Sequence, residues 1–362
     1  MIVAEAPGKL FVTGEYAVVE PGRHAVVVGV SRLLRARLRA ASTGRGSTVT
    51  SPHFGPQPVP IVIEDGRVSV QAPGADLLQE CLQVLLDLAL ERGLVVEDFD
   101  LEIESQLDDV SGRKFGLGSS GAVAVVTVRA VAEHLGVDLD DDAVFRLASL
   151  ATIELRPAAS CADIATSTLG GWVHYASPDR AAVSELRRAR GITATLAAPW
   201  PGLVLESLPE PSAIVLHVGW TSAPASTAEL VGTLHAGDWR ATDEYAAFLL
   251  ESDRITEALV AAIRADHAEP ALAAIRDAEA NLEALDELSA IGIRTPALRS
   301  LIAAARGVGL PAKTSGAGGG DCGIALAPAR NHELDAAWRA AGIEVLDLHV
   351  VPHRRVGVRD HG

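Results

Sequence analysis

A glycine-dense run near the end of the chain, KTSGAGGGDCG at residues 313–323, constrains the fold more than any other feature. Every glycine there costs conformational entropy on folding, so stability alone does not explain five glycines in eleven residues. Glycine is needed where another group approaches the backbone closely. We therefore expect a ligand, or a second glycine-rich loop, to press against this backbone.

A second glycine-rich loop, KFGLGSSG at residues 114–121, leads into an apolar stretch that we predict to be a helix ending near Gly136. Free backbone N–H groups and the positive end of the helix dipole meet at such a loop, and glycine lets a phosphate approach them. The loop formally matches the dinucleotide pattern G-x-G-x-x-G, but the preceding LDDVSGRKF is polar where a Rossmann fold needs a buried strand. A purely structural turn would not need its two serines and its lysine, and neither run fits the Walker A pattern. The loop favours an anion site at a helix N-terminus.

The composition describes a globular chain with an acidic surface. With 362 residues, 48% hydrophobic and 22% charged, the chain predicts two domains or one large one. Its formal charge of −16 repels a phosphate backbone, so we expect no nucleic-acid partner. No apolar run approaches the roughly 20 residues of a membrane span, and the start MIVAEAPGK lacks the layout of a secretory signal. We expect a cytoplasmic protein without a membrane partner, with reduced Cys81, Cys161 and Cys322.

The first third of the sequence is typical of strands and the second half of helices. Apolar runs within the first 40 residues predict strands at 2–7, 16–19, 24–31 and 32–40. A loop is expected over 41–58 and a last strand at 344–351. Helical spacing of apolar residues is found at 76–92, 140–155, 225–235, 239–264, 268–289, 296–307 and 331–341. Because strands and helices do not alternate regularly, we predict an α+β protein instead of a doubly wound α/β one. Several arginines and prolines set residues 178–211 apart in composition, which indicates a crossover between domains at 1–185 and 186–362.

Two further patterns have plain structural explanations. Arg35, Arg37 and Arg39 alternate with apolar residues, which we interpret as the exposed face of an edge strand, with a phosphate-binding row as the alternative. His349 and His353 are four residues apart, but the apolar residues and proline between them predict the end of a strand instead of a zinc site.

A third segment, APGKLFVTGEY at residues 6–16, joins the first two predicted strands. Its Pro-Gly-Lys, the GLGSS before a helix and the late SGAGGGDCG resemble the three motifs of the GHMP kinase family, in order and spacing over nearly the whole chain. DIATSTLGGW at 163–172 and GWTSAPAST at 219–227 look most like the phosphomevalonate kinase branch of that family. The resemblance implies an N-terminal S5-like α+β domain and a C-terminal ferredoxin-like domain, with ATP and substrate between them.

The resemblance also implies roles for particular residues. Lys9, Lys114 and Asp163 would be catalytic. The ATP phosphates would be bound by Lys114 and by the loop residues Gly116, Leu117, Gly118, Ser119, Ser120 and Gly121. The hydroxyl of Ser120 would be nearest Mg²⁺. The acceptor would be bound by Lys9, Ser160, Ser222, Gly316, Ala317, Gly318 and Gly319.

The family's chemistry gives an expected reaction, ATP-dependent phosphorylation of 5-phosphomevalonate. The acceptor phosphate has a second pKa near ~6 and is mostly deprotonated at neutral pH, so a strong base is unnecessary. Lys9 and Lys114 would offset repulsion between the two anions, while Asp163 orients Lys9 and the acceptor. Lys313 is a further candidate cation, and Glu154 is a candidate second Mg²⁺ ligand by resemblance. The alternative activity is mevalonate kinase or another small-molecule kinase of the family.

Simpler interpretations stay open for several residues. Asp163 would serve as a helix N-cap ahead of IATSTL. Ser222 and Ser226 are candidates for substrate contact, but capping of the helix expected at 225–235 explains Ser226 nearly as well. Cys161 and Cys322 are expected to be small buried residues, because no histidine partner marks a nucleophile. A catalytically silent sensor would keep the loops without turnover. The sequence is compatible with a monomer or a homodimer.

Overall fold

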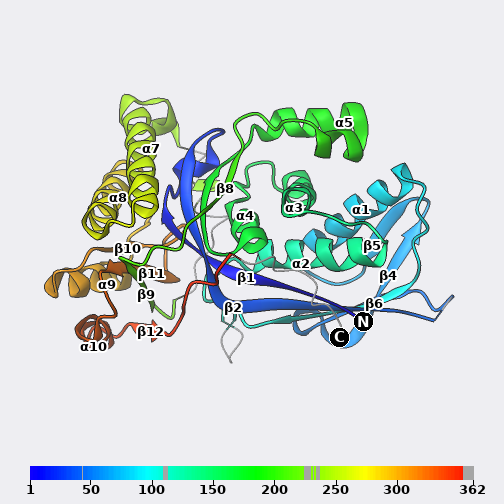
Figure 1. Cartoon of the computed structure of the whole chain (residues 1–362), viewed down its shortest axis with the longest axis horizontal. Helices are drawn as coiled ribbons and strands as arrows, with labels where there is room; N and C mark the ends of the chain where they lie inside the picture. The colour runs from blue at the N-terminus through cyan, green and yellow to red at the C-terminus, as the bar shows by residue number, and fades with distance from the viewer. Residues whose placement is uncertain (43, 109–112, 224–229, 231, 234–236, 354–362) are drawn as a thin grey trace.

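The chain forms two β-sheets with helices packed on them (Figure 1). The computed structural model describes residues 1–42, 44–108, 113–223, 230, 232–233 and 237–353. Helices and strands segregate along the chain instead of alternating, so the predicted α+β class is confirmed.

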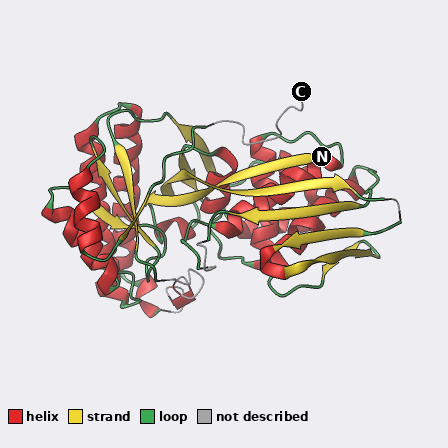
Figure 2. Cartoon of the chain, turned by 90° about the horizontal axis from the view of Figure 1, so that it is seen from below, coloured by secondary structure: helices red, strands yellow, loops and turns green. Residues whose placement is uncertain are grey.

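The larger sheet contains β1 to β8. The bounds of these strands are β1 Ile2–Thr13, β2 His24–Ala40, β3 Ser47–Ser51, β4 Gly55–Glu64, β5 Arg67–Val70, β6 Phe99–Ser105, β7 Trp172–Ala176 and β8 Val204–Leu208. Their order is β5-β4-β3-β6-β2-β7-β8, with β1 also paired to β2. β2 is a long central strand that pairs with β1, β6 and β7, and Figure 2 shows the long strands of this sheet crossing the molecule.

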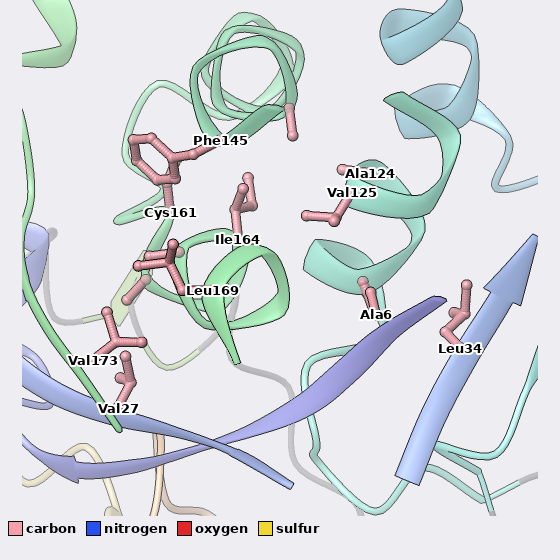
Figure 3. Close-up of a cluster of buried hydrophobic side chains, with 14 of the residues drawn as sticks. Ala6, Val27, Leu34, Ala124, Val125, Phe145, Cys161, Ile164, Leu169 and Val173 are labelled. Atoms are coloured by element: carbon pink, nitrogen blue, oxygen red, sulfur yellow. The ribbon is translucent and has the colours of Figure 1, made fainter. Parts of the chain in front are cut away.

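Helices pack on this sheet and form the main core. They are α1 Asp76–Glu91, α2 Ser119–His134, α3 Asp141–Leu155, α4 Ala162–Leu169 and α5 Arg180–Ala197. α2 and α4 contact β1 and β2 directly, whereas α5 contacts α1 and α3. Figure 3 shows Ala6 of β1, Leu34 of β2, Val125 of α2 and Ile164 of α4 in one buried cluster. Burying each valine or leucine of this kind contributes about 1.5–3 kcal/mol.

The smaller sheet has the order β10-β11-β9-β12 and is antiparallel throughout. Its strands are β9 Val215–Trp220, β10 Ala312–Thr314, β11 Cys322–Ala327 and β12 Glu344–Leu346. The helices of this half are α7 Asp243–Arg264, α8 Ala268–Ser289, α9 Pro296–Gly307 and α10 His332–Ala340. Short 3₁₀ helices are η1 Ala17–Val19, η2 Pro52–Phe54 and η3 Asp238–Ala241. One buried cluster includes residues of both sheets, such as Val28 of β2 and Val218 of β9, so the two halves share a core.

Several local predictions are wrong. Residues 6–16 belong largely to β1 instead of linking two strands, and Ala17–Val19 is a 3₁₀ helix where we predict a strand. Residues 41–58, predicted to be a loop, contain β3 and the start of β4. The crossover 178–211 contains α5 and β8, and β8 pairs with β7 in the larger sheet. Residue 185, the expected boundary, lies inside α5, and the domain bounds themselves stay a prediction.

The chain beyond β12 returns to the larger sheet instead of extending that strand to residue 351. Val351 donates its N–H to the Gly29 carbonyl at 2.9 Å, and Gly171 donates to the Val351 carbonyl at 2.6 Å. These bonds hold the segment between β2 and the start of β7.

The basic row lies on a central strand and not on an edge strand. Arg35 pairs with Glu5 of β1, and the Arg37 guanidinium lies 2.9 Å from the Glu104 carboxylate of β6. Carboxylates on the neighbouring strands thus balance the row. The interpretation as a solvated, ion-paired face is the one that the structure supports.

The remaining predictions concern the helix expected at 225–235, membrane-spanning helices and the three cysteines. Ser226 and most of the helix expected at 225–235, namely residues 225–229, 231 and 234–235, lie outside the described residues. In the described part of the chain, no helix is long and apolar enough to cross a bilayer. Cys81, Cys161 and Cys322 are free thiols, all of them buried.

Candidate active site

Lys9 lies on β1 at the point where this strand meets the start of α2. A register shift between Pro7 and Gly8 marks an irregularity in β1 just before it. The Lys9 N–H donates to the Leu117 carbonyl at 2.8 Å, and Lys9 Nζ donates to the Gly116 carbonyl at 3.2 Å. That second bond uses one of the three donors of the ammonium group. β1 therefore holds the Lys9 ammonium beside the first glycine loop, the name used below for residues 116–121.

The first glycine loop forms the N-terminus of α2. Gly116 and Gly118 have φ values of 79° and 77°, which glycine adopts without strain. Gly118 is the N-cap of α2, so the N–H groups of the first helical residues have no partners within the helix. A Cβ on Gly118 would lie 2.7 Å from Cγ of Lys9, so glycine also makes room for that side chain. Backbone donors, a helix dipole and a lysine meet here, which is an arrangement suited to phosphate.

Asp163 lies in the first turn of α4, against Gly121. The N-cap of α4 is Cys161, at φ 62°, so the interpretation of Asp163 as an N-cap is wrong. A Cβ on Gly121 would lie 2.8 Å from the Asp163 carboxyl group. Ser167 of α4 donates to the Pro7 carbonyl of β1 at 2.9 Å. The structure therefore brings Asp163, β1 and the first glycine loop together.

The second glycine run, residues 315–321, connects β10 to β11 and also reaches Lys9. A Cβ on Gly316 would lie 3.7 Å from Lys9 Nζ. Ser315 donates its hydroxyl to the Phe11 carbonyl of β1 at 3.0 Å. The Lys9 ammonium is thus a neighbour of both glycine-rich segments.

Side chains and backbone of the chain itself press on the second glycine run. The Gly319 N–H donates to the Ile293 carbonyl at 2.9 Å, and Gly318 packs so closely on that carbonyl that no Cβ fits. The side chain of Asp321 lies against Gly116 of the first glycine loop. The expectation of a close neighbour is therefore confirmed for the first loop, while at Gly318 the neighbour is Ile293, which the sequence did not indicate.

Lys313 is a buried structural cation and not a phosphate ligand, contrary to its candidacy. Its side chain is fully buried, forms an ion pair with Glu15 and donates to the Thr314 carbonyl at 2.7 Å. Tyr16 donates its hydroxyl to the Ala317 carbonyl. Burial, together with nearby carboxylates, raises the pKa of Tyr16 far above its ordinary value, so this hydroxyl stays a neutral donor. Glu15 thus connects the segment after β1 to β10, and Tyr16 connects it to the second glycine run.

Three other residues with expected roles lie around this group. Lys114 is exposed and forms an isolated backbone bridge with Asp108. Ser160 accepts the Ala162 N–H at 3.4 Å, just before α4. Ser222 has φ 59° and follows β9. Their contacts with ligands stay predictions.

The two cysteines beside the glycine-rich segments are inert thiols. Burial raises the pKa of Cys161 to about 12 and that of Cys322 well above the ordinary range. Cys322 donates its Sγ–H to the Phe115 carbonyl at 3.1 Å. Since the thiolate is the reactive form, neither cysteine is suited to act as a nucleophile.

Glu154 is engaged elsewhere. Its carboxylate lies 3.4 Å from the Arg187 guanidinium of α5, which also pairs with Glu80 and Asp87 of α1. The charge of Glu154 is therefore balanced in an ion-pair group between helices, and its role as a second Mg²⁺ ligand stays a prediction.

Comparison with known proteins decides the family. Residues 76–171 match the model of the GHMP kinases N terminal domain, and residues 259–344 match the model of the GHMP kinases C terminal. The chain belongs to the GHMP kinase family.

Individual relatives resemble this GHMP kinase over nearly its full length. A phosphomevalonate kinase of Streptomyces sp. (strain CL190) is 44% identical, covering 96% of each chain. A mevalonate kinase of Pyrococcus horikoshii is 29% identical, covering 94% of this chain and 93% of the relative. A structure of Streptococcus pneumoniae phosphomevalonate kinase in complex with phosphomevalonate and AMPPNP has a TM-score of 0.85 at 29% identity, covering 97% and 100% of the two chains. The predicted family and its two-domain fold are confirmed.

Sequence reasoning did not identify three residues that the structure places at the motifs of this GHMP kinase. Glu15 and Tyr16 lie within the first motif, and the single carboxylate of this glycine-containing segment was an available signal. Asp321 directly follows three consecutive glycines. A charged side chain in a segment that otherwise favours glycine was the available signal there.

Proposed function

We propose that this GHMP kinase transfers the γ-phosphoryl group of ATP to 5-phosphomevalonate, a step of the mevalonate route to isopentenyl diphosphate. A phosphate oxygen of the acceptor attacks the γ-phosphorus while the bond from that phosphorus to ADP breaks, and 5-diphosphomevalonate and ADP leave. The 44% identity to a phosphomevalonate kinase, against 29% to a mevalonate kinase, supports this acceptor. The likeness to a structure that holds phosphomevalonate and AMPPNP supports it too.

The observation that carries the proposal is the position of Lys9 between the two glycine-rich segments. Its Nζ lies 3.2 Å from the Gly116 carbonyl, and a Cβ on Gly316 would lie 3.7 Å from it. In the proposal the first glycine loop binds the ATP phosphates, and the second glycine run binds the acceptor together with Ser160 and Ser222. Two phosphorylated reactants repel each other, and a shared cation offsets that repulsion. On a chain of formal charge −16, Lys9 and Lys114 supply the local positive charge.

Asp163 has an orienting role in this proposal. The acceptor phosphate, with its second pKa near ~6, is already mostly deprotonated at neutral pH, so no base needs to remove a proton. The carboxylate lies against Gly121, where it can hold the acceptor and Lys9 in line with the nucleotide.

The residues beside the first glycine loop fit a magnesium ion. Mg²⁺ prefers oxygen ligands, keeps several waters and is held in kinases by one or two protein groups plus substrate phosphates. Ser120 offers a hydroxyl in the first turn of α2, and the Asp163 carboxyl group lies against the adjacent Gly121. The Ser120 hydroxyl, together with the substrate phosphates and water, would hold the ion, which when bound neutralises charge on the phosphate oxygens.

Release of ADP in a coupled assay tests the acceptor. The enzyme receives Mg²⁺ and ATP and, in separate reactions, mevalonate, 5-phosphomevalonate or 5-diphosphomevalonate. Turnover with 5-phosphomevalonate alone is the expected result. Turnover with mevalonate instead would show that mevalonate is the acceptor and would favour Asp163 as a base. No turnover with any of the three compounds would overturn the proposed reaction.

The proposal extends to the setting of the enzyme. Three free, buried cysteines support a reducing compartment, and we propose the cytoplasm. The choice between a monomer and a homodimer stays a prediction.

A further inference from the structure

We propose that Asp321 is a positioning residue. Its side chain packs against Gly116 and so holds the first glycine loop in the conformation that binds nucleotide. The inference rests on the proposed nucleotide role of that loop. It concerns a residue of the second glycine run that neither the sequence motifs nor the resemblance assigned.

The backbone conformation at Asp321 favours glycine, yet glycine is absent. Asp321 has φ 53°, in the left-handed region, after Gly318 at 69° and Gly319 at 72°. A residue with a Cβ pays roughly 1–2 kcal/mol in this region, and aspartate is among the few that visit it. Glycine would relieve that cost, so the aspartate side chain is the feature of this position that the proposal explains.

The main chain of Asp321 is fixed independently of its side chain. Its N–H donates to the Ala223 carbonyl at 2.7 Å. Its carbonyl accepts the Thr221 N–H at 2.9 Å and the Thr221 hydroxyl at 3.0 Å. The segment after β9 therefore anchors Asp321, and a change of side chain leaves this anchor in place.

The side chain of Asp321 lies directly against Gly116. A Cβ on Gly116 would lie 2.5 Å from Cβ, Cγ and Oδ2 of Asp321. The next residue, Cys322, donates to the Phe115 carbonyl at 3.1 Å. Two successive residues of the smaller sheet's half thus support the start of the first glycine loop. The Gly116 carbonyl is also the acceptor of the Lys9 ammonium, so a shift of Gly116 would displace that cation as well.

Contact, and not charge, explains this role. A carboxylate beside a loop that binds phosphates would repel them, so the proposal assigns the role of Asp321 to its contact with Gly116 instead of its charge. Asparagine has the same shape and also tolerates the left-handed region, so Asp321→Asn should keep the contact. Asp321→Gly keeps the backbone, relieves its strain and removes the contact.

The two substitutions separate positioning from folding. Affinity for AMPPNP with Mg²⁺ is measured by titration calorimetry, and stability by thermal unfolding. Asp321→Gly is expected to weaken AMPPNP binding by roughly tenfold or more, since small displacements of a positioning group have such effects, while its Tm stays equal or rises. Asp321→Asn is expected to bind within about twofold of the unsubstituted protein. KM for ATP should rise in Asp321→Gly more than KM for the acceptor.

Asp65→Gly is the matched control. Asp65 is an aspartate with φ 49° in the exposed turn between β4 and β5, so the same backbone change occurs far from either motif. It should leave AMPPNP affinity unchanged. Unchanged affinity in Asp321→Gly, equal weakening in Asp321→Asn, or a large loss of Tm in Asp321→Gly would each overturn the positioning role. If the unsubstituted protein bound no AMPPNP, the proposed function itself would fail, and this inference with it, before any variant is compared.

Discussion

The two glycine-rich segments of this kinase use glycine for different purposes. In the first glycine loop, Gly118 and Gly121 make room for the side chains of Lys9 and Asp163, which belong to the proposed site. In the second glycine run, Gly318 makes room for the backbone of a supporting loop. The first segment is shaped around side chains of the proposed site, whereas the second is shaped largely around the backbone of a neighbouring loop.

This difference predicts different consequences of substitution. Changes around the first glycine loop should reduce activity and leave stability nearly intact, because its neighbours are partly exposed polar groups. Changes to the buried ion pairs next to the second glycine run, Glu15 with Lys313 and Glu279 with Arg294, should reduce stability. The substitutions below test that division.

Lys9→Ala is expected to have the largest effect on activity. It removes the cation that both segments share, so kcat/KM should fall by roughly 10³-fold. The free energy of unfolding should change by less than about 1 kcal/mol, because the Lys9 ammonium donates one hydrogen bond to a neutral carbonyl and otherwise lies over the Phe11 ring. Steady-state kinetics and urea unfolding measure the two quantities. Arg39→Ala, which removes a cation 71% exposed on β2, is the control and should keep full activity.

Lys313→Met should show the reverse pattern. It leaves the Glu15 carboxylate buried without its ion-pair partner, which costs about 3–5 kcal/mol of unfolding free energy. The double variant Glu15→Gln with Lys313→Met should recover much of that loss, because neither of the two positions then carries a buried charge. Urea unfolding of the single and double variants measures the difference. Equal losses in both would contradict the assignment of a buried ion pair.

Glu279 makes the stability of the folded protein depend on pH. Arg294, which follows the supporting Ile293, lies with its Nε 3.0 Å from the Glu279 carboxylate. Burial raises the pKa of Glu279 to about 7, from 4.5 for an ordinary glutamate, although Arg294 and Lys313 act in the opposite direction. Between these values the folded protein holds a proton that the unfolded chain has lost, so stability falls as pH rises from about 4.5 to about 7.

Glu279→Gln should flatten that pH dependence. At about 1.4 kcal/mol per pKa unit, the difference across the interval is up to roughly 3 kcal/mol. Urea unfolding at pH 5 and pH 8 measures it for both proteins. An identical slope in the variant would show that Glu279 is not the titrating group.

Local signals were enough to predict much of the fold. The helices at 268–289 and 296–307 have the bounds predicted from their apolar spacing, because that spacing is a property of the segment itself. β3 and the start of β4 were missed because a strand rich in serine, threonine and proline is defined by its partners. β2 was divided into two strands since a long strand with three partners has no single burial pattern.

The same distinction applies to the site. Lys9 and the first glycine loop could be found because each motif is continuous in sequence. The contacts of Asp321 with Gly116 and of Glu15 with Lys313 join residues about 200 or 300 positions apart, and no local pattern encodes them. Lys313 was misassigned as a candidate phosphate cation for this reason, since its glycine-rich setting does not reveal a buried partner.

Gly121→Ala tests how tightly the first glycine loop is fitted to Asp163. The new Cβ would lie 2.8 Å from the carboxyl group and 2.9 Å from the Asp163 backbone, so α2 or α4 must shift. A displacement of this kind should reduce kcat/KM by about 10²-fold. Gly307→Ala, where a Cβ meets nothing within 4 Å, is the matched control and should retain activity. Activity assays of both variants, with Tm as a check on folding, decide the outcome.

Asp163→Asn should have the smallest effect and separates orientation from base catalysis. Asparagine keeps an oxygen in the same position, so an orienting residue loses only about tenfold in kcat, less than Lys9→Ala loses. No solvent isotope effect is expected, because an acceptor phosphate at neutral pH has no proton to give up in the transition state. A loss as large as that of Lys9→Ala, together with a solvent isotope effect, would restore the general base. Since only a hydroxyl acceptor needs such a base, that outcome would also move the preferred acceptor from a phosphate to an alcohol.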